Sequence, residues 1–287
     1  MRRLLLTGAT GFIGREALHQ IDRERYDVHA LSRRPPAGPA DGISWHAADL
    51  LDAGQLADAV ANIAPTHLLH LAWEAGRSDY RTAPRNLDWL AAGVHLARAF
   101  REHGGVRAVY AGTCAEYQPA SSLYATSKSA VAASVSEYAR TDGWHFAWGR
   151  IFWPYGPGSA SRRLVPYVIE RLLVGEVAHC SPGSQQRDFI HVSDVASALV
   201  ALLGSDVDGP VDIGSGEGTP VRTVVEWIAR DMNRADLVSF DGPPPLPEEP
   251  DTMVARPTEL RSLGWACRPL REGLTQTIEW YRERMPA

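Results

Sequence analysis

An apolar strand that runs directly into three glycines constrains the fold of this chain more than any other feature. The strand is Arg3–Thr7, and Gly8, Gly11 and Gly14 follow it at a spacing of three residues. Glycines let the chain turn sharply from a buried strand into a helix and let the backbone approach a bound group closely. The N–H groups of the following helix would then point at an anion. The segment predicts a dinucleotide-binding turn, and an ordinary turn between a strand and a helix is the alternative.

Strands and amphipathic helices alternate through the first half of the sequence. Further strand candidates are residues 28–31, 67–72, 106–112 and 145–152. Asn86–His103 is a clear helical stretch, and Gly104 is a plausible stop for it. Such alternation predicts an α/β fold, a Rossmann-type doubly wound parallel sheet. The alternation breaks at Tyr155–Gly158, where we expect a smaller C-terminal lobe to begin. Trp265, Trp280 and Tyr281 are expected to anchor the core of that lobe.

Composition excludes several classes of protein. The net charge is −5 with no basic patch, which argues against a nucleic-acid partner. No apolar run approaches the length that spans a bilayer, so we expect no membrane partner. Three widely separated cysteines predict neither a disulfide framework nor a metal site. The first strand lies close to Met1 and leaves no room for a signal peptide, so we expect a cytoplasmic protein.

The end of the second strand indicates which dinucleotide binds. Ser32, Arg33 and Arg34 stand where an enzyme that uses NAD usually carries an acidic residue for the ribose hydroxyls. Guanidinium groups pair with the 2′-phosphate of NADP, whereas a carboxylate would repel it. We therefore expect NADP, with NAD as the alternative if the arginines are only solvated. Asp49 and Leu50, after a third short strand, are placed to meet the adenine.

Tyr124 and Lys128 are one helical turn apart and share a helix face. A neighbouring ammonium is expected to lower the pKa of the phenol and so make it an acid–base group. Thr113 ends a strand at the carboxyl edge of the predicted sheet, where ligands bind in open α/β folds. Its hydroxyl would hold a substrate oxygen while Tyr124 transfers the proton.

Together these motifs resemble the extended short-chain dehydrogenase/reductase family, in its branch of nucleotide-sugar epimerases, dehydratases and ketoreductases. The resemblance is carried by Thr7–Gly14, by Thr113, Tyr124 and Lys128, and by Arg150–Pro157, Arg187–Ala196, Asp212–Gly216 and Leu263–Trp265. It implies a dinucleotide-binding domain of residues 1–152 plus about 188–213. Residues 153–187 and 214–287 would form the substrate-binding lobe. It also implies a nucleotide-sugar substrate and a possible homodimer through the helices at 86–103 and 124–140.

The resemblance extends the list of candidate site residues. The cofactor set is Gly8, Gly11, Phe12, Ile13, Gly14, Ser32, Arg33, Arg34, Asp49, Leu50, Leu71 and Ala72. The substrate set is Trp73, Asn86, Trp153, Arg163 and Arg187, where Arg187 matches the arginine that contacts the nucleotide diphosphate. A packing role for Trp73 and surface roles for the arginines are the alternatives.

Departures from the family pattern favour one activity. Cys114-Ala115 replaces the acidic pair that follows the catalytic Thr in the family's dehydratases, so dehydration is not expected. Trp153 replaces an Asn common in enzymes that use UDP-sugars, which puts a UDP-sugar substrate in doubt. An exchangeable NADP suits net reduction, and we expect a ketoreductase that acts on a nucleotide-linked 4-keto-6-deoxyhexose. A nucleotide-sugar epimerase is the main alternative, and a dinucleotide-sensing protein without turnover is a second.

Overall fold

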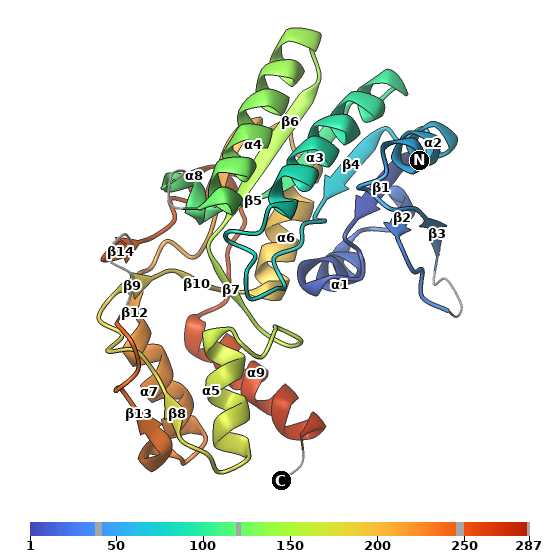
Figure 1. The fold of residues 1–287 in the computed structure, drawn as a ribbon. Helices are drawn as coiled ribbons and strands as arrows, with labels where there is room; N and C mark the ends of the chain where they lie inside the picture. The colour runs from blue at the N-terminus through green and yellow to red at the C-terminus, as the bar shows by residue number, and fades with distance from the viewer. Residues whose placement is uncertain (38–41, 119–121, 245–249, 286–287) are drawn as a thin grey trace. The chain divides into compact units, whose positions relative to one another are not determined.

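A computed structural model describes residues 1–37, 42–118, 122–244 and 250–285 (Figure 1). The chain divides into two compact units. The first consists of residues 1–151, 196–212 and 259–265, and the second of residues 152–195, 213–258 and 266–287. Each unit has its own hydrophobic core.

A seven-stranded sheet forms the centre of the first unit. Its strands, in spatial order, are β11 (Gly209–Ile213), β6 (His145–Ile151), β5 (Arg107–Thr113), β4 (His67–His70), β1 (Arg2–Thr7), β2 (Tyr26–Ser32) and β3 (Ile43–Ala47). The pairs from β3 through to β6 are all parallel. The order reverses between β1 and β4, because β2 and β3 lie on one side of β1 while β4, β5 and β6 lie on the other. Open α/β sheets bind their ligands at such a reversal, outside the carboxyl ends of the strands.

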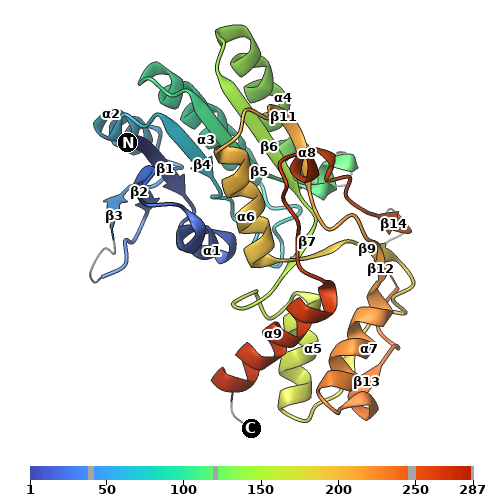
Figure 2. The ribbon, with the colours of Figure 1, turned by 180° about the vertical axis from the view of Figure 1, so that it is seen from behind.

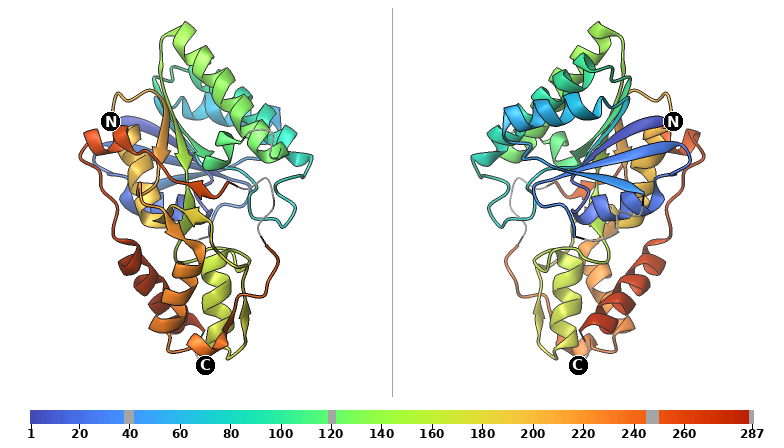
Figure 3. Two further views of the ribbon diagram at one scale, coloured as in Figure 1. Left: turned by 90° about the vertical axis from the view of Figure 1, so that its left-hand side faces the viewer. Right: turned by 90° about the vertical axis from the view of Figure 1, so that its right-hand side faces the viewer.

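Helices cover both faces of this sheet. Figures 2 and 3 show α2 (Ala53–Ile63), α3 (Arg85–Glu102) and α4 (Leu123–Asp142) on one face, and α1 (Phe12–Gln20) and α6 (Val192–Leu203) on the other. The short α8 (Thr258–Ser262) also belongs largely to this unit. The doubly wound α/β sheet expected from the alternation of strands and helices is confirmed.

Local sequence explains where these elements begin and end. Leu4, Leu5 and Leu6 are completely buried because β1 is covered on both faces, which accounts for its continuous apolar run. The side chain of Ser122 caps α4 by accepting from Ala125 N–H, and Gly143 ends the helix in the left-handed conformation. These two boundaries fix the part of α4 that carries Tyr124 and Lys128.

The second unit is built from three helices and short strands. The helices are α5 (Leu164–Leu173), α7 (Val221–Asp231) and α9 (Leu270–Arg284). The strand pairs are β7 (Trp153–Tyr155) with β10 (Phe189–His191), β9 (Gln186–Arg187) with β12 (Thr219–Pro220) and β14 (Thr252–Met253), and β8 (Ala178–His179) with β13 (Val238–Ser239). Tyr281 is buried in the core of this unit and Trp280 packs against it, as expected. The expectation for Trp265 is wrong, because this residue belongs to the first unit, where its indole N–H donates to Ser197 Oγ at 2.8 Å.

Two negative findings apply to the described residues. No helix among them is long and apolar enough to cross a membrane. No group of three or more His, Cys, Asp or Glu side chains among them is arranged to hold a metal ion.

Candidate active site

The glycine turn lies where the sheet order reverses. Gly8 has a φ of +73°, and a Cβ added there would lie 2.7 Å from the backbone nitrogen of Ala72, just beyond β4. Gly11 N–H donates to Gly8 O at 2.9 Å and closes the turn. A Cβ on Gly14 would collide with the backbone of Gly8. Gly8 and Gly14 are therefore needed for the path of the chain.

Helix α1 begins directly after this turn, and its first N–H groups fit an anion. Gly11 is the N-cap residue and provides no side chain to accept from the first turn, and the first turn contains no acidic residue. Phe12 and Ile13 open the helix, so their backbone N–H groups have no intrahelical acceptor. An uncapped, uncharged helix start beside a glycine turn fits the pyrophosphate of a dinucleotide.

The carboxyl end of β2 presents two exposed guanidinium groups. Arg33 and Arg34 follow the strand directly, and no ion pair of either is found within the described part of the chain. Ser32 Oγ is occupied locally, since it donates to Arg34 O at 3.0 Å and accepts from Arg34 N–H at 3.2 Å. The hydroxyl thus fixes the backbone that carries Arg34.

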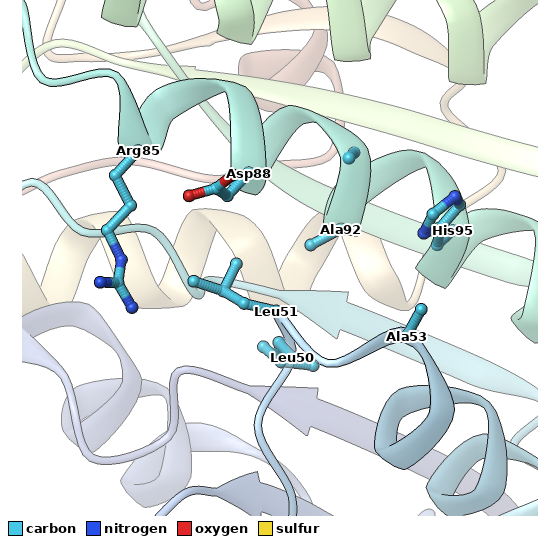
Figure 4. A pocket seen from close by; sticks show the side chains of 8 residues that line it. Leu50, Leu51, Ala53, Arg85, Asp88, Ala92 and His95 are labelled. Atoms are coloured by element: carbon cyan, nitrogen blue, oxygen red, sulfur yellow. The ribbon is translucent and has the colours of Figure 1, made fainter.

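Asp49 and Leu50 follow β3, at the same edge of the sheet. Asp49 Oδ1 accepts from Leu51 N–H at 3.1 Å, which shapes the loop. Leu50 lines a cavity of about 350 Å³ under α3, with Asp88 and His95 among its other lining residues (Figure 4).

Thr113 and Tyr124 meet at the carboxyl end of β5. Thr113 is the last residue of the strand, Tyr124 lies in the first turn of α4, and the two side chains are hydrogen-bonded. Burial raises the pKa of Tyr124, and the hydrogen bond with Thr113 only partly opposes that change. The expectation that Lys128 lowers this pKa is wrong for this structure, because burial is the dominant cause. Tyr124 is therefore a protonated phenol at neutral pH.

Lys128 is buried on the same helix as Tyr124 and is the only lysine in the sequence. Its ammonium donates to Ala111 O at 2.6 Å, and the ring of Trp73 lies over it with the centroid 4.0 Å from Nζ. Burial lowers the pKa of Lys128 to about 7, and the carboxylate of Glu116 works in the opposite direction.

Glu116 is a component of the site that the sequence analysis missed. It lies in the short helix η1 (Cys114–Tyr117), and it forms a capping box with Thr113. Its Oε1 accepts from Thr113 N–H and its Oε2 accepts from Trp148 Nε1–H, both at 2.7 Å. The pattern Thr-x-x-Glu after a strand is the signal that could have identified it.

Trp73 and Asn86, both expected near a substrate, contact each other. Trp73 Nε1–H donates to Asn86 Oδ1 at 3.0 Å, and Asn86 Nδ2 donates to the carbonyls of Tyr80 and Ala83. Asn86 is 3% exposed and holds the loop between β4 and α3. Tyr80 in that loop packs edge-on against Tyr124, with ring centroids 5.2 Å apart. Trp73 and Asn86 thus hold the loop that packs against Tyr124. Their contact with a substrate stays a prediction.

The remaining substrate candidates lie in the second unit. The guanidinium carbon of Arg187 is 5.0 Å from the ring centroid of Trp153. Arg187 is 2% exposed and donates to Pro250 O at 2.7 Å. Arg163 is exposed at the start of α5. The structure thus brings Trp153 and Arg187 together.

Comparison with known proteins decides the family. A sequence model described as "NAD dependent epimerase/dehydratase family" matches residues 4–214. The chain belongs to this family. It is therefore an enzyme of the extended short-chain dehydrogenase/reductase type, and the resemblance seen in its motifs is confirmed.

Members of this family with different activities match nearly the whole chain. A dTDP-glucose 4,6-dehydratase of Mycolicibacterium smegmatis is 28% identical over 98% of this chain and 93% of the relative. A dTDP-4-dehydro-6-deoxy-D-allose reductase of Streptomyces bikiniensis is 24% identical over 98% and 96%. The crystal structure of a UDP-glucose 4-epimerase of Thermus thermophilus in complex with NAD is similar with a TM-score of 0.84 and 27% identity, covering 98% of this chain and 99% of the epimerase.

Proposed function

We propose that this enzyme uses NADPH to reduce the keto group of a nucleotide-linked 4-keto-6-deoxyhexose. Arg33 and Arg34 carry the proposal, because they stand exposed at the end of β2, where an enzyme that uses NAD usually carries a carboxylate. Guanidinium groups suit a 2′-phosphate. A cofactor held by exposed charges can exchange after each turnover, and exchange is what a net reduction needs. The reductase from Streptomyces bikiniensis supports this class of substrate.

The chain's own residues would donate the proton, hold the substrate oxygen and bind the cofactor ribose. The bound dinucleotide supplies the hydride. Tyr124 is protonated because burial raises its pKa, so it is ready to give a proton to the substrate oxygen. Thr113, which is hydrogen-bonded to Tyr124, would hold the same oxygen. Lys128 would bind the ribose next to the nicotinamide with N–H groups that Ala111 O does not use.

The position of Glu116 supports reduction over dehydration. Cys114 and Ala115 cannot act as the acid and base that remove water. Glu116 is the next carboxylate along the chain. One of its oxygens accepts from Thr113 N–H, the other accepts from Trp148 Nε1–H, and its side chain is 5% exposed. A buried carboxylate that is occupied in this way cannot replace the missing pair.

The second unit would recognise the nucleotide. Arg187 and Arg163 would pair with the diphosphate, and Trp153 would give the base or sugar a flat apolar surface. A homodimer through α3 and α4 stays a prediction.

Consumption of reduced cofactor tests the proposal. The purified enzyme should oxidise NADPH, and NADH more slowly, when it is given a panel of nucleotide-linked 4-ketosugars. Replacing Arg33 and Arg34 together by Ala should raise the KM for NADPH about 10- to 100-fold, which corresponds to ~1.5–3 kcal/mol for hydrogen bonds to a charged group. Arg25→Ala is the matched control, because Arg25 is an exposed arginine before the opposite end of β2. Lack of NADPH oxidation with every ketosugar would exclude the proposal.

Epimerisation is the second candidate, favoured by the likeness to the Thermus thermophilus epimerase that binds NAD. An epimerase returns the hydride to the same substrate molecule, so it needs a cofactor that stays bound. Stoichiometric dinucleotide in the purified protein, together with interconversion of two nucleotide sugars, would decide for it.

A sensor without turnover would not need the phenol of Tyr124. Tyr124→Phe should lower kcat about 100-fold or more while cofactor affinity stays unchanged, because the phenol acts in proton transfer. A variant that keeps every measurable function would favour the sensor.

A further inference from the structure

A buried carboxylate lies next to the proposed catalytic residues, and no role in proton or hydride transfer is left for it. Glu116 accepts from the backbone N–H of Thr113 and from the indole of Trp148, each at 2.7 Å. Its side chain is 5% exposed. Burying a charge of this kind is unfavourable unless it is paired, so the presence of a carboxylate at this buried position requires an explanation.

The surrounding backbone is shaped to admit this contact. A Cβ on Gly112 would collide with the indole nitrogen of Trp148 and would lie 2.8 Å from Glu116 Oε1. Strands β5 and β6 pair at this level, with Gly112 opposite Arg150. Arg150 Nε lies 3.7 Å from Glu116 Oε2. Glycine on β5 thus leaves the space in which an indole from β6 reaches a carboxylate from η1.

Lys128 is a buried cation that lies over the ring of the same indole. Its Nζ is 5.6 Å from the centroid of Trp148, while Nε1 of that ring donates to Glu116. The ammonium donates to a neutral carbonyl, Ala111 O, and contacts the ring of Trp73. A buried ammonium with neutral partners tends to lose its proton.

The other titratable groups around Lys128 are neutral, cationic or, in the case of Asp212, already in contact with Tyr117 and Arg150. His70 on β4 is neutral, because burial and the nearby Lys128 lower its pKa to about 3. Tyr124 on α4 is neutral because burial raises its pKa. Arg150 on β6 is a cation, and Asp212 on β11 accepts from Tyr117 and lies 3.9 Å from Arg150. Glu116 is the remaining source of negative charge, and it opposes the effect of burial on Lys128.

We propose that Glu116 is a positioning residue that supplies the counter-charge for the Lys128 ammonium and fixes the end of β5 that carries Thr113. The effect of this role on turnover rests on the proposed function. Glu116 itself does not touch the substrate. It would act by its charge on Lys128, which would bind the cofactor, and by a hydrogen bond to the backbone of Thr113, which would hold the substrate oxygen.

The single lysine makes the charge effect directly measurable. Protein labelled with ¹³C-lysine gives one side-chain NMR signal, from Lys128, that can be followed against pH without substrate or cofactor. In Glu116→Gln, Lys128 should lose its proton at a pH lower by about 1 or more than in the wild type, since an opposite charge at short range shifts a pKa by ~1–3. Glu137→Gln is the matched control, because Glu137 is an exposed glutamate on α4 that pairs with Arg140. It should leave the titration unchanged.

A wild-type measurement keeps the test decisive if Glu116→Gln does not fold. The Lys128 signal of the wild type should show a second, smaller inflection where Glu116 takes up its own proton, and burial raises the pKa of that carboxyl above its usual value. Glu116→Asp, which keeps the charge but shortens the side chain, should keep Lys128 protonated close to the wild-type pH while kcat falls. A wild-type titration in one step, or an unshifted Lys128 in folded Glu116→Gln, would overturn the proposal.

Turnover separates this inference from the proposed function. In Glu116→Gln, the limb of the kcat–pH profile that depends on Lys128 should move with the NMR titration, while the KM for the nucleotide sugar changes little. If the wild type reduces no ketosugar, the proposed reaction fails but the titration still decides the role of Glu116. If the wild type is active and the profile does not move, the positioning role fails alone.

Discussion

The ring of Trp73 covers the ammonium of Lys128, with the centroid 4.0 Å from Nζ. The same indole donates to Asn86, which in turn holds the backbone of the loop between β4 and α3. A single side chain therefore links the buried cation to the conformation of that loop.

Replacing Trp73 should show a pH-dependent loss of stability. Trp73→Phe keeps an aromatic face over Lys128, whereas Trp73→Leu removes it, and both lose the hydrogen bond to Asn86. At pH 6, where Lys128 is protonated, Trp73→Leu should reduce the free energy of unfolding by ~1–2 kcal/mol more than Trp73→Phe. Urea titrations at pH 6 and pH 9 measure the difference, which should shrink at pH 9. An equal difference at both pH values would rule out a cation–π contribution.

Lys128 should make the stability of the protein rise with pH. The pKa of Lys128 falls from 10.5 to about 7 on folding, so between these values the unfolded chain binds the extra proton. Stability should therefore rise with pH by up to ~1.4 kcal/mol per pH unit in that window, and this gain should disappear below it. Lys128→Met lacks the titrating group, so its free energy of unfolding should lie above that of the wild type near pH 7. Parallel curves for the two proteins between pH 7 and pH 10 would contradict the shift.

Gly8→Ala should cost more than a left-handed glycine elsewhere. The added methyl group lies 2.7 Å from the nitrogen of Ala72, which is held next to β4, and the φ of +73° is itself unfavourable for alanine. Gly104→Ala is the matched control, because Gly104 has a φ of +90° and nothing within 4 Å of an added Cβ. Gly104→Ala should cost ~1 kcal/mol, and Gly8→Ala should cost more and abolish dinucleotide binding. Urea unfolding and fluorescence titration with NADPH measure the two effects, and similar losses in both variants would exclude the clash.

Ser32→Asp should reverse the preference between the two dinucleotides. A carboxylate at the end of β2 would repel a 2′-phosphate and accept hydrogen bonds from free ribose hydroxyls. The ratio of kcat/KM for NADPH to that for NADH should fall about 100-fold, which corresponds to ~2.7 kcal/mol. Ser32→Ala removes only the hydroxyl that binds the backbone of Arg34 and should change the ratio little. An unchanged ratio in Ser32→Asp would show that this position lies away from the 2′ position.

The alternation of strands and helices predicted five of the seven strands by residue range, but it gave no range for β3 and did not predict β11. The run Leu4–Leu6 is completely buried, and the other predicted strands of the first half agree with β2, β4, β5 and β6 to within about two residues at each end. β2 begins two residues earlier than predicted, and β4 ends at His70 instead of Ala72. Leu71 N–H still donates to Thr7 O, but the chain then turns away over Gly8. Because the apolar sequence continues through Leu71 and Ala72, composition does not indicate where β4 ends.

Tertiary contacts explain what the sequence analysis could not predict. The spacing of Tyr124 and Lys128 correctly placed both on one helix, but the pKa of Tyr124 depends on burial by residues distant in sequence, such as Tyr80. The family resemblance predicts the acid pair of a dehydratase at positions 114 and 115, whereas the buried carboxylate is one residue further along, at Glu116. The partner of Glu116 is Trp148, 32 residues away, and local patterns carry no information on such a pairing.

The presence of a single lysine has a practical consequence for labelling chemistry. Apart from the N-terminus of the chain, a reagent that modifies primary amines has one target in this protein, and that target lies beside the proposed catalytic tyrosine. The extent of Lys128 modification at a saturating dose therefore measures the fraction of molecules in which this part of the interior has opened to solvent. A bound ligand that keeps the interior closed would register as protection at one defined atom, Lys128 Nζ.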